Sequence, residues 1–374
     1  MKKIIISIVS LVSFLTINIA QADVKIGGFM QSISAMGDDI DGGISEKFTR
    51  LSMGADTTID NGWTVGGSFA MEFSSISTGE NSPYLPTANS MFVQTDMGTF
   101  TIGDAGDAVT ITIPRVGALG PGAGHDGGYH AMFDNGMLAS EGVRFSEAYY
   151  AMSNSRVTFQ MPSVNGFSAA ISYTPDMSFN SKSGITRNQG VFSGAHGETA
   201  HIAVKYSGEI DGMSYDIGLG SINGNSQSVS GTNTMNDLAV FTGSVQVTMG
   251  NTTFGFHGYD NGESFGSSAD AIKAKDNGYT VAFNHNMGNM SIGGGYTVME
   301  KVRGTRAQAA ASTQTSAPAG AVRKDESTYI GVGYNMGGGV NTFLQLMQDD
   351  HTDGDPTNTE ADPQMLIFGM SLGF

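Results

Sequence analysis

The last eleven residues of the chain, Gln364-Met365-Leu366-Ile367-Phe368-Gly369-Met370-Ser371-Leu372-Gly373-Phe374, alternate between two kinds of side chain. Large apolar residues occupy every second position, at Leu366, Phe368, Met370, Leu372 and Phe374. The positions between them hold Ile367, Gly369, Ser371 and Gly373. A period of two residues is typical of a β-strand whose two faces meet different surroundings. This stretch therefore predicts a strand with one large apolar face.

The same alternation recurs upstream. Tyr279, Val281 and Phe283 share one face of a segment, as do Ile330, Val332 and Tyr334 of another, with small or polar residues between them. From Asp23 onward the period of two dominates over the helical period of 3.6. The chain is therefore expected to be all-β.

The connections between these strands alternate in length. Seven are short and rich in residues that tolerate positive φ: 60–62, 96–99, 164–166, 211–212, 248–251, 286–289 and 335–338. Eight are long and polar: 37–46, 76–88, 105–153, 175–199, 222–236, 261–277, 300–326 and 350–363. Together they separate sixteen strands, with room for the roughly 9 to 11 residues that cross a membrane as a tilted strand.

The composition favours a membrane barrel. Only 14% of the residues are charged, against a usual share of about 25%. Beyond residue 20 no uncharged apolar run reaches the ~20 residues of a membrane-spanning helix. The non-apolar strand faces carry mostly Gly, Ser, Thr and Asn, while the apolar faces end in aromatics such as Tyr206, Tyr334 and Phe374. We therefore expect a closed antiparallel barrel with lipid outside and water inside; the alternatives are a soluble β-sandwich and a secreted β-solenoid.

The first 22 residues read as a secretory signal. Lys2 and Lys3 precede an apolar stretch, and Ala20-Gln21-Ala22 supplies the small residues of a cleavage site. Residues 1–22 are thus expected to be removed and residues 23–374 to form the barrel; the alternative is an uncleaved anchor helix. Cleavage would lower the net charge from −17 to −19, which speaks against nucleic acid as a partner.

Several motifs resemble those of the general diffusion porins of Gram-negative outer membranes, most closely their alphaproteobacterial branch. They are 23–29 (DVKIGGF), 98–105 (GTFTIGDA), 165–169 (NGFSA), 334–339 (YNMGGG) and the terminal Phe374. The resemblance covers the whole mature chain. It implies a sixteen-stranded transmembrane β-barrel in the outer membrane, reached through the periplasm, that forms a homotrimer and folds its third long loop inward to narrow the pore. The Ala/Ser/Thr-rich loop at 303–320 and the Gly/His-rich third loop depart from the family's pattern.

That third loop, residues 105–153, is the longest irregular segment, and long loops in compact folds are usually functional. Its acidic residues include Asp107, Asp126, Asp134 and Glu141. From the residues alone, a solvated external loop and an inward-folded one are both open. The resemblance favours the inward fold, which makes 105–153 the candidate constriction loop.

Strand parity selects basic residues that face the lumen, because Arg or Lys on the lipid face near the midplane costs ~2 to 4 kcal/mol. These residues are Lys25, Arg50, Arg156 and Lys205. The hypothesis is that they face the acids of 105–153 across the pore constriction and set up a transverse field. The alternative for each is a rim or external position with little influence on conduction.

No enzyme is expected. The chain has no Cys and no G-x-S-x-G elbow, and no cofactor is indicated. His125 and His130 form only a weak metal pattern, and the acids near Asp350 lack EF-hand spacing.

The predicted function is passive diffusion of ions and small hydrophilic solutes. Outer-membrane lipid is an expected partner, and the basic residues near 301–324 could contact lipopolysaccharide. Alternatives are a solute-selective porin with a lumenal binding site, or a non-conducting structural or adhesive barrel.

Overall fold

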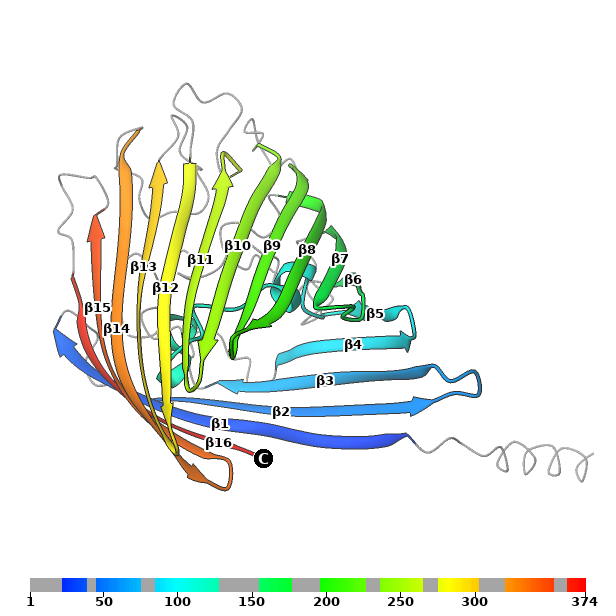
Figure 1. The fold of residues 1–374 in the computed structure, drawn as a ribbon, viewed down its shortest axis with the longest axis horizontal. Coiled ribbons are helices and arrows are strands. Elements are labelled where there is room, and N and C mark those ends of the chain that lie inside the picture. The colour runs from blue at the N-terminus through cyan, green and yellow to red at the C-terminus, as the bar shows by residue number, and fades with distance from the viewer. Residues whose placement is uncertain are drawn as a thin grey trace, which may run out of the picture.

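The structure, a computed structural model, describes residues 22–38, 45–74, 85–127, 155–176, 196–226, 236–264, 275–302, 320–352 and 362–374. Sixteen strands form one closed barrel (Figure 1). They are β1 (Asp23–Asp38), β2 (Ser45–Thr58), β3 (Thr64–Ser74), β4 (Leu85–Thr95), β5 (Gly98–Gly103), β6 (Arg156–Gln160), β7 (Phe167–Asp176), β8 (His196–Ile210), β9 (Met213–Ser226), β10 (Leu238–Met249), β11 (Thr252–Gly262), β12 (Lys275–Met287), β13 (Met290–Val302), β14 (Val322–Gly337), β15 (Val340–Thr352) and β16 (Gln364–Gly373).

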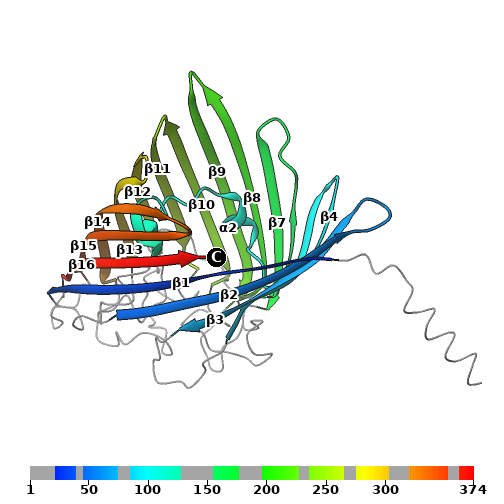
Figure 2. The ribbon, with the colours of Figure 1, turned by 90° about the horizontal axis from the view of Figure 1, so that it is seen from below.

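Every strand pairs antiparallel with its neighbours in the chain, and β1 pairs with β16 to close the ring (Figure 2). The closing register joins Phe29 to Gly373 and Asp38 to Gln364. All seven predicted short turns lie between consecutive strands. The β6–β7 turn has φ of 50° at Asn165 and 85° at Gly166, as a short hairpin turn requires. The predicted sixteen-stranded antiparallel barrel is confirmed.

Strand length differs from the prediction. β1 and β14 each have 16 residues, whereas β5 and β6, which flank the third long segment, have six and five. The long strands continue past the apolar band into polar residues such as Lys324 and Glu326, which pair with each other at 2.8 Å. The sheet therefore extends beyond the width that lipid would cover.

The outward face forms the predicted apolar belt. Phe368, Met370 and Phe374 are 52%, 48% and 64% exposed. Aromatic rings contact one another near the short turns, with centroids 4.4 Å apart for Phe100 and Phe159. Exposed apolar side chains flanked by aromatics are the pattern of a barrel surrounded by lipid. Among the described residues, no helix is long and apolar enough to cross a membrane.

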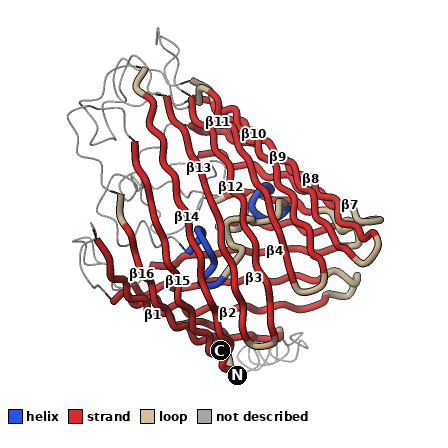
Figure 3. The backbone as a smooth tube through the Cα atoms, turned by 60° about the vertical axis from the view of Figure 1, so that its left-hand side comes forward, coloured by secondary structure: helices blue, strands red, loops and turns tan. Residues whose placement is uncertain are grey.

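The inner face is less polar than expected. Two short helical segments, α2 (Ala108–Thr112) and η1 (Pro121–Gly127), lie inside the ring of strands (Figure 3). On β14 to β16 and β1 the inward side chains form a buried apolar cluster: Ile33, Ala35, Tyr329, Phe343, Met347, Met365 and Ile367. This wall is covered rather than wet, because η1 and its flanking residues pack against it.

Candidate functional site

The third long segment leaves the sheet at Gly103. Its φ of 118° lies in the region that favours glycine, and a Cβ there would lie 2.2 Å from the Asn89 carbonyl oxygen. Asp104 then donates its backbone N–H to the same carbonyl at 2.7 Å. The chain turns inward and begins α2, with Asp107 as the N-cap that accepts from the N–H groups of Val109 and Thr110 at 2.9 and 3.1 Å. An N-cap carboxylate satisfies donors that have no partner within the helix.

A row of inward side chains on adjacent strands holds this turn. Thr158 of β6, Ser172 of β7 and His201 of β8 are directly paired across the sheet. Thr158 Oγ1 donates to the Gly106 carbonyl at 3.3 Å, and Ser172 Oγ accepts from the Ala108 N–H at 3.0 Å. His201 Nδ1 lies 3.2 Å from Asp107 Oδ1. Each member of the row therefore contacts one residue of the segment.

Arg156 completes a buried charge cluster around Asp107. Its Nη1 lies 3.2 Å from Asp107 Oδ2, and both side chains are 1% exposed. Burial alone would raise the pKa of the Asp107 carboxyl, but hydrogen bonding and charge from His201, with the Arg156 charge, hold that pKa well below its usual range. Asp107 is therefore ionised at neutral pH and fastens α2 to the wall.

Asp107→Ala is expected to loosen α2, because alanine has no side-chain oxygen to accept from the N–H groups of Val109 and Thr110. Loss of the N-cap leaves the backbone amides of Val109 and Thr110 without their acceptor. Their hydrogen-exchange rates, corrected for intrinsic rates, should then increase on the order of tenfold. Because the folded pKa of Asp107 is depressed, its stabilisation is present above the unfolded pKa of about 3.9 and is lost only as pH falls through the lower folded value. The unsubstituted chain should thus keep this protection from pH 7 to pH 4. Loss of protection within that range would contradict the charge cluster.

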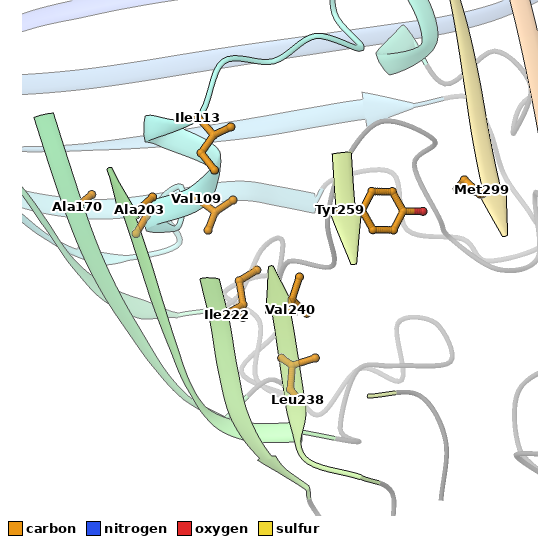
Figure 4. Packing of buried hydrophobic residues seen from close by; sticks show 10 residues of the cluster. Val109, Ile113, Ala170, Ala203, Ile222, Leu238, Val240, Tyr259 and Met299 are labelled. Atoms are coloured by element: carbon orange, nitrogen blue, oxygen red, sulfur yellow. The ribbon is translucent and has the colours of Figure 1, made fainter. Parts of the chain in front are cut away.

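Inward glycines form a bed for the segment. A Cβ at Gly220 would lie 2.8 Å from Ile113 and 3.0 Å from Val109, and one at Gly255 would lie 2.9 Å from both Val116 and Leu119. Val109 of α2 and Ile113, which follows α2, belong to one buried cluster with Ile222 and Val240 of the strand wall (Figure 4). The missing side chains therefore create the space that the segment fills. We call the inward glycines Gly218, Gly220, Gly255, Gly293 and Gly333 the glycine bed.

η1 fastens the far end of the described segment. His125 Nδ1 lies 3.2 Å from Thr297 Oγ1, and its ring meets that of Tyr329 edge to face with centroids 4.6 Å apart. The Tyr329 hydroxyl donates to the Leu119 carbonyl. Burial lowers the pKa of His125 to about 3, although a hydrogen bond with the Ser327 backbone opposes this. His125 is therefore neutral at neutral pH.

The remaining predicted site residues lie apart from these anchors. On the inner face, Lys25 Nζ pairs with Asp56 at 3.0 Å, and Lys205 Nζ lies 3.7 Å from Asp216. Arg50 is half-buried on the same face as Ser52. In the segment, Asp126 pairs with Arg115 at 3.0 Å. Asp134 and Glu141 lie outside the described residues, as do residues 128–153, so the inward fold of the complete segment stays a prediction.

Two predicted residues differ from the hypothesis in their arrangement. Asp107 and Arg156 were expected to face each other across the pore constriction, and the structure places them in direct contact and buried. The physical reason is that Asp107 caps a helix that lies on the wall, beside the strand that carries Arg156. The prediction missed the roles of His201, Ser172 and the glycine bed. Strand parity can place a residue on the inward face, but it does not tell which inward residues contact the segment, because that depends on the path of the segment.

Within the described residues, no group of three or more His, Cys, Asp or Glu is arranged to hold a metal ion. His130, the second member of the weak metal pattern, lies outside those residues.

The comparisons with known proteins agree with the geometry. A family model described as Gram-negative porin matches residues 10–354. OmpT of Vibrio cholerae, in its trimer form, is 13% identical over 94% of this chain and 99% of its own, with a TM-score of 0.61. The anion-selective porin of Comamonas acidovorans is 15% identical over 95% and 100%, with a TM-score of 0.60. A mutant of the Rh. blastica porin is 16% identical over 94% and 100%, with a TM-score of 0.55. No curated protein matches the sequence.

Proposed function

The chain belongs to the Gram-negative porin family and forms a diffusion channel in the outer membrane, and on this premise we propose that ions and small hydrophilic solutes cross it along the inner wall of β1 to β4. Polar inward side chains there reach water: Lys25 is 75% exposed, and Ser68 is also exposed. The inward Ile33 and Ala35 of β1 belong instead to the buried apolar cluster. On the opposite wall, Ser172 and Ser244 are 1% and 3% exposed. This difference in exposure between two inward faces carries the proposal.

The third long segment, 105–153, narrows this passage. A sixteen-stranded barrel is wide enough for an aqueous lumen, so an inserted element must set the size limit. Support comes from residues 104–127, which occupy the side of the lumen formed by β6 to β15. Among the described residues, the polar groups that line the passage include those of β1 to β4, the Lys205–Asp216 pair of β8 and β9, and the exposed side of residues 104–127.

Single cysteines can map the passage, because the chain has none of its own. We expect Ser68→Cys to react with a charged methanethiosulfonate reagent and to lower single-channel conductance in a planar bilayer. Ser244→Cys is the matched control: it is inward too, but Ser244 is buried and donates to the Pro114 carbonyl at 2.9 Å. It should not react. Equal reaction at both positions would overturn the proposed path, and the absence of conductance steps would overturn diffusion itself.

The native assembly is proposed to be a homotrimer surrounded by lipid and lipopolysaccharide. The exposed outward apolar residues and the recorded trimer form of Vibrio cholerae OmpT support it. Sedimentation in detergent should give three chains per particle.

We propose further that residues 1–22 are removed as a signal, since β1 begins at Asp23. We also propose that the protein is not an enzyme. The mass of the membrane-extracted chain tests the cleavage.

A further inference from the structure

One aromatic side chain stands on the otherwise polar inner wall of β2 to β5. The strand register places Phe92 of β4 inward, directly opposite Gly66 of β3 on one side and Thr101 of β5 on the other. Among residues 52–58, 64–70, 90–94 and 99–101 it is the only inward aromatic, and the other inward positions hold Ser, Thr, Gly, Ala, Gln and Asp. The wall of the proposed passage therefore carries one phenyl ring within a polar surface.

The ring of Phe92 lies over a glycine. A Cβ at Gly66 would lie 2.7 Å from both Cε1 and Cζ of Phe92, so a side chain there would displace the ring. Phe92 is half-buried, because the backbone of β3 covers part of the ring while the rest faces the lumen. Gly66 thus serves as the support on which the ring rests.

Charged groups lie beside the ring at the spacing of neighbouring strands. Asp56 of β2 is directly opposite Gly66, and Asp23 of β1 is directly opposite Asp56. Asp56 is therefore one strand, about 4.8 Å, from the glycine under the ring. Lys25 Nζ pairs with Asp56 Oδ1 at 3.0 Å, and both side chains reach water. Farther along the inward face of β2 and β3 are Glu46, Arg50 and Glu72. Acids and cations are mixed on this wall, which suits a neutral polar solute.

Uncharged polar groups complete the surroundings. Ser68 and Ser90 are the next inward residues along β3 and β4 on one side of the ring, and their Oγ atoms lie 3.4 Å apart. Thr64 and Gln94 are the next inward pair on the other side. An apolar face with a few fixed polar groups around it is the usual composition of a small-molecule site.

We infer that Phe92 is a stacking platform for neutral saccharides, with Asp56 and Lys25 as the groups that bind sugar hydroxyls. A pyranose with equatorial hydroxyls has an apolar face of C–H bonds and a polar edge. The face of a phenyl ring carries partial negative charge and attracts such C–H groups. An ionised carboxylate accepts hydrogen bonds from hydroxyls, and an ammonium group donates to their oxygens. The inference rests on the proposed function and adds to it the class of solute.

Glucose and mannitol test the inference in planar bilayers. The two are of nearly equal size, but mannitol is acyclic and has no fixed apolar face. Glucose should lower the single-channel current in a saturable way, with half-saturation on the order of millimolar because water competes for the exposed polar groups. Mannitol should lower the current only in proportion to its concentration, through the viscosity of the solution.

Substitutions at Phe92 identify the platform. Phe92→Leu keeps an apolar side chain but removes the ring, so the half-saturating glucose concentration should rise about threefold to tenfold, the range of an aromatic contact. Phe92→Trp should retain saturation. Phe283→Leu is the matched control: its ring also lies over a glycine, since a Cβ at Gly294 would lie 3.1 Å from Phe283 Cε1, but on the outward face. Its glucose response should equal that of the unsubstituted chain.

Conductance steps in Phe92→Leu show that this variant is folded. If glucose acts on the unsubstituted channel no differently from mannitol, or if Phe92→Leu and Phe283→Leu respond to glucose alike, the inference is wrong and the diffusion function stands. If the unsubstituted protein gives no conductance steps, the proposed function itself fails.

Discussion

Gly255→Leu is expected to reduce single-channel conductance by roughly one half, a larger change than any single charge substitution should cause. A Cβ at Gly255 would already lie 2.9 Å from Val116 and from Leu119, well inside the ~3.5 to 4.0 Å at which carbon atoms attract one another. An isobutyl group there needs space that the segment now fills. The segment must therefore move away from the wall and into the lumen.

The two contacts that anchor the segment set the direction in which it moves. On one side of Gly255 the segment is held by the charge cluster at Asp107, and on the other by His125 and Tyr329 of the η1 contact. With both ends fixed, the middle can only bow toward the facing wall of β1 to β4. The passage should narrow, and the current should fall rather than rise.

Gly258→Leu is the matched control. It lies on the same strand, β11, but on the outward face, where a Cβ would meet only ordinary contacts at 3.6 Å or more. The same added volume should leave conductance unchanged and join the apolar belt. Equal conductance in both variants would show that the segment does not bear on the passage. A rise in Gly255→Leu would mean that the anchors do not hold.

The residues show why the sequence predicts the barrel well and the site less well. A strand's face depends only on whether a position is odd or even, so Phe368, Met370 and the inward Arg156 are all placed correctly by parity. Short turns can be predicted from residues such as Asn165 and Gly166, which can adopt positive φ. Both signals are local, and local signals give the number and order of strands.

The site depends on contacts that are distant in sequence. Ser172 and His201 become neighbours across a connection of nearly twenty residues between β7 and β8, so no turn fixes their register in advance. In the sequence, a glycine that faces water looks the same as a glycine that faces a packed segment. Gly220 and Gly255 can therefore be recognised as members of the glycine bed only once the path of the segment is known. For the same reason the exposed Arg115 and the buried Asp126 could not be ordered by depth.

Phe368→Arg is expected to cost the folded barrel ~2 to 4 kcal/mol in a lipid bilayer, because a guanidinium near the middle of the apolar belt loses its hydration. Phe368 is 52% exposed on the outward face and is paired with Leu344, itself exposed, on the neighbouring strand. Urea unfolding of protein refolded into phosphatidylcholine vesicles, followed by the mobility shift between folded and unfolded barrel, measures the loss.

Ser68→Arg places the same charge on the inward face, at an exposed position opposite Ser90. The new guanidinium should stay hydrated in the lumen, so the free energy of unfolding should change little while the permeability ratio shifts toward anions. The two substitutions thus separate the lipid side of the wall from its water side. If Phe368→Arg were as stable as Ser68→Arg in vesicles, the belt would not face hydrocarbon, since the cost of burying the charge is what distinguishes the two faces.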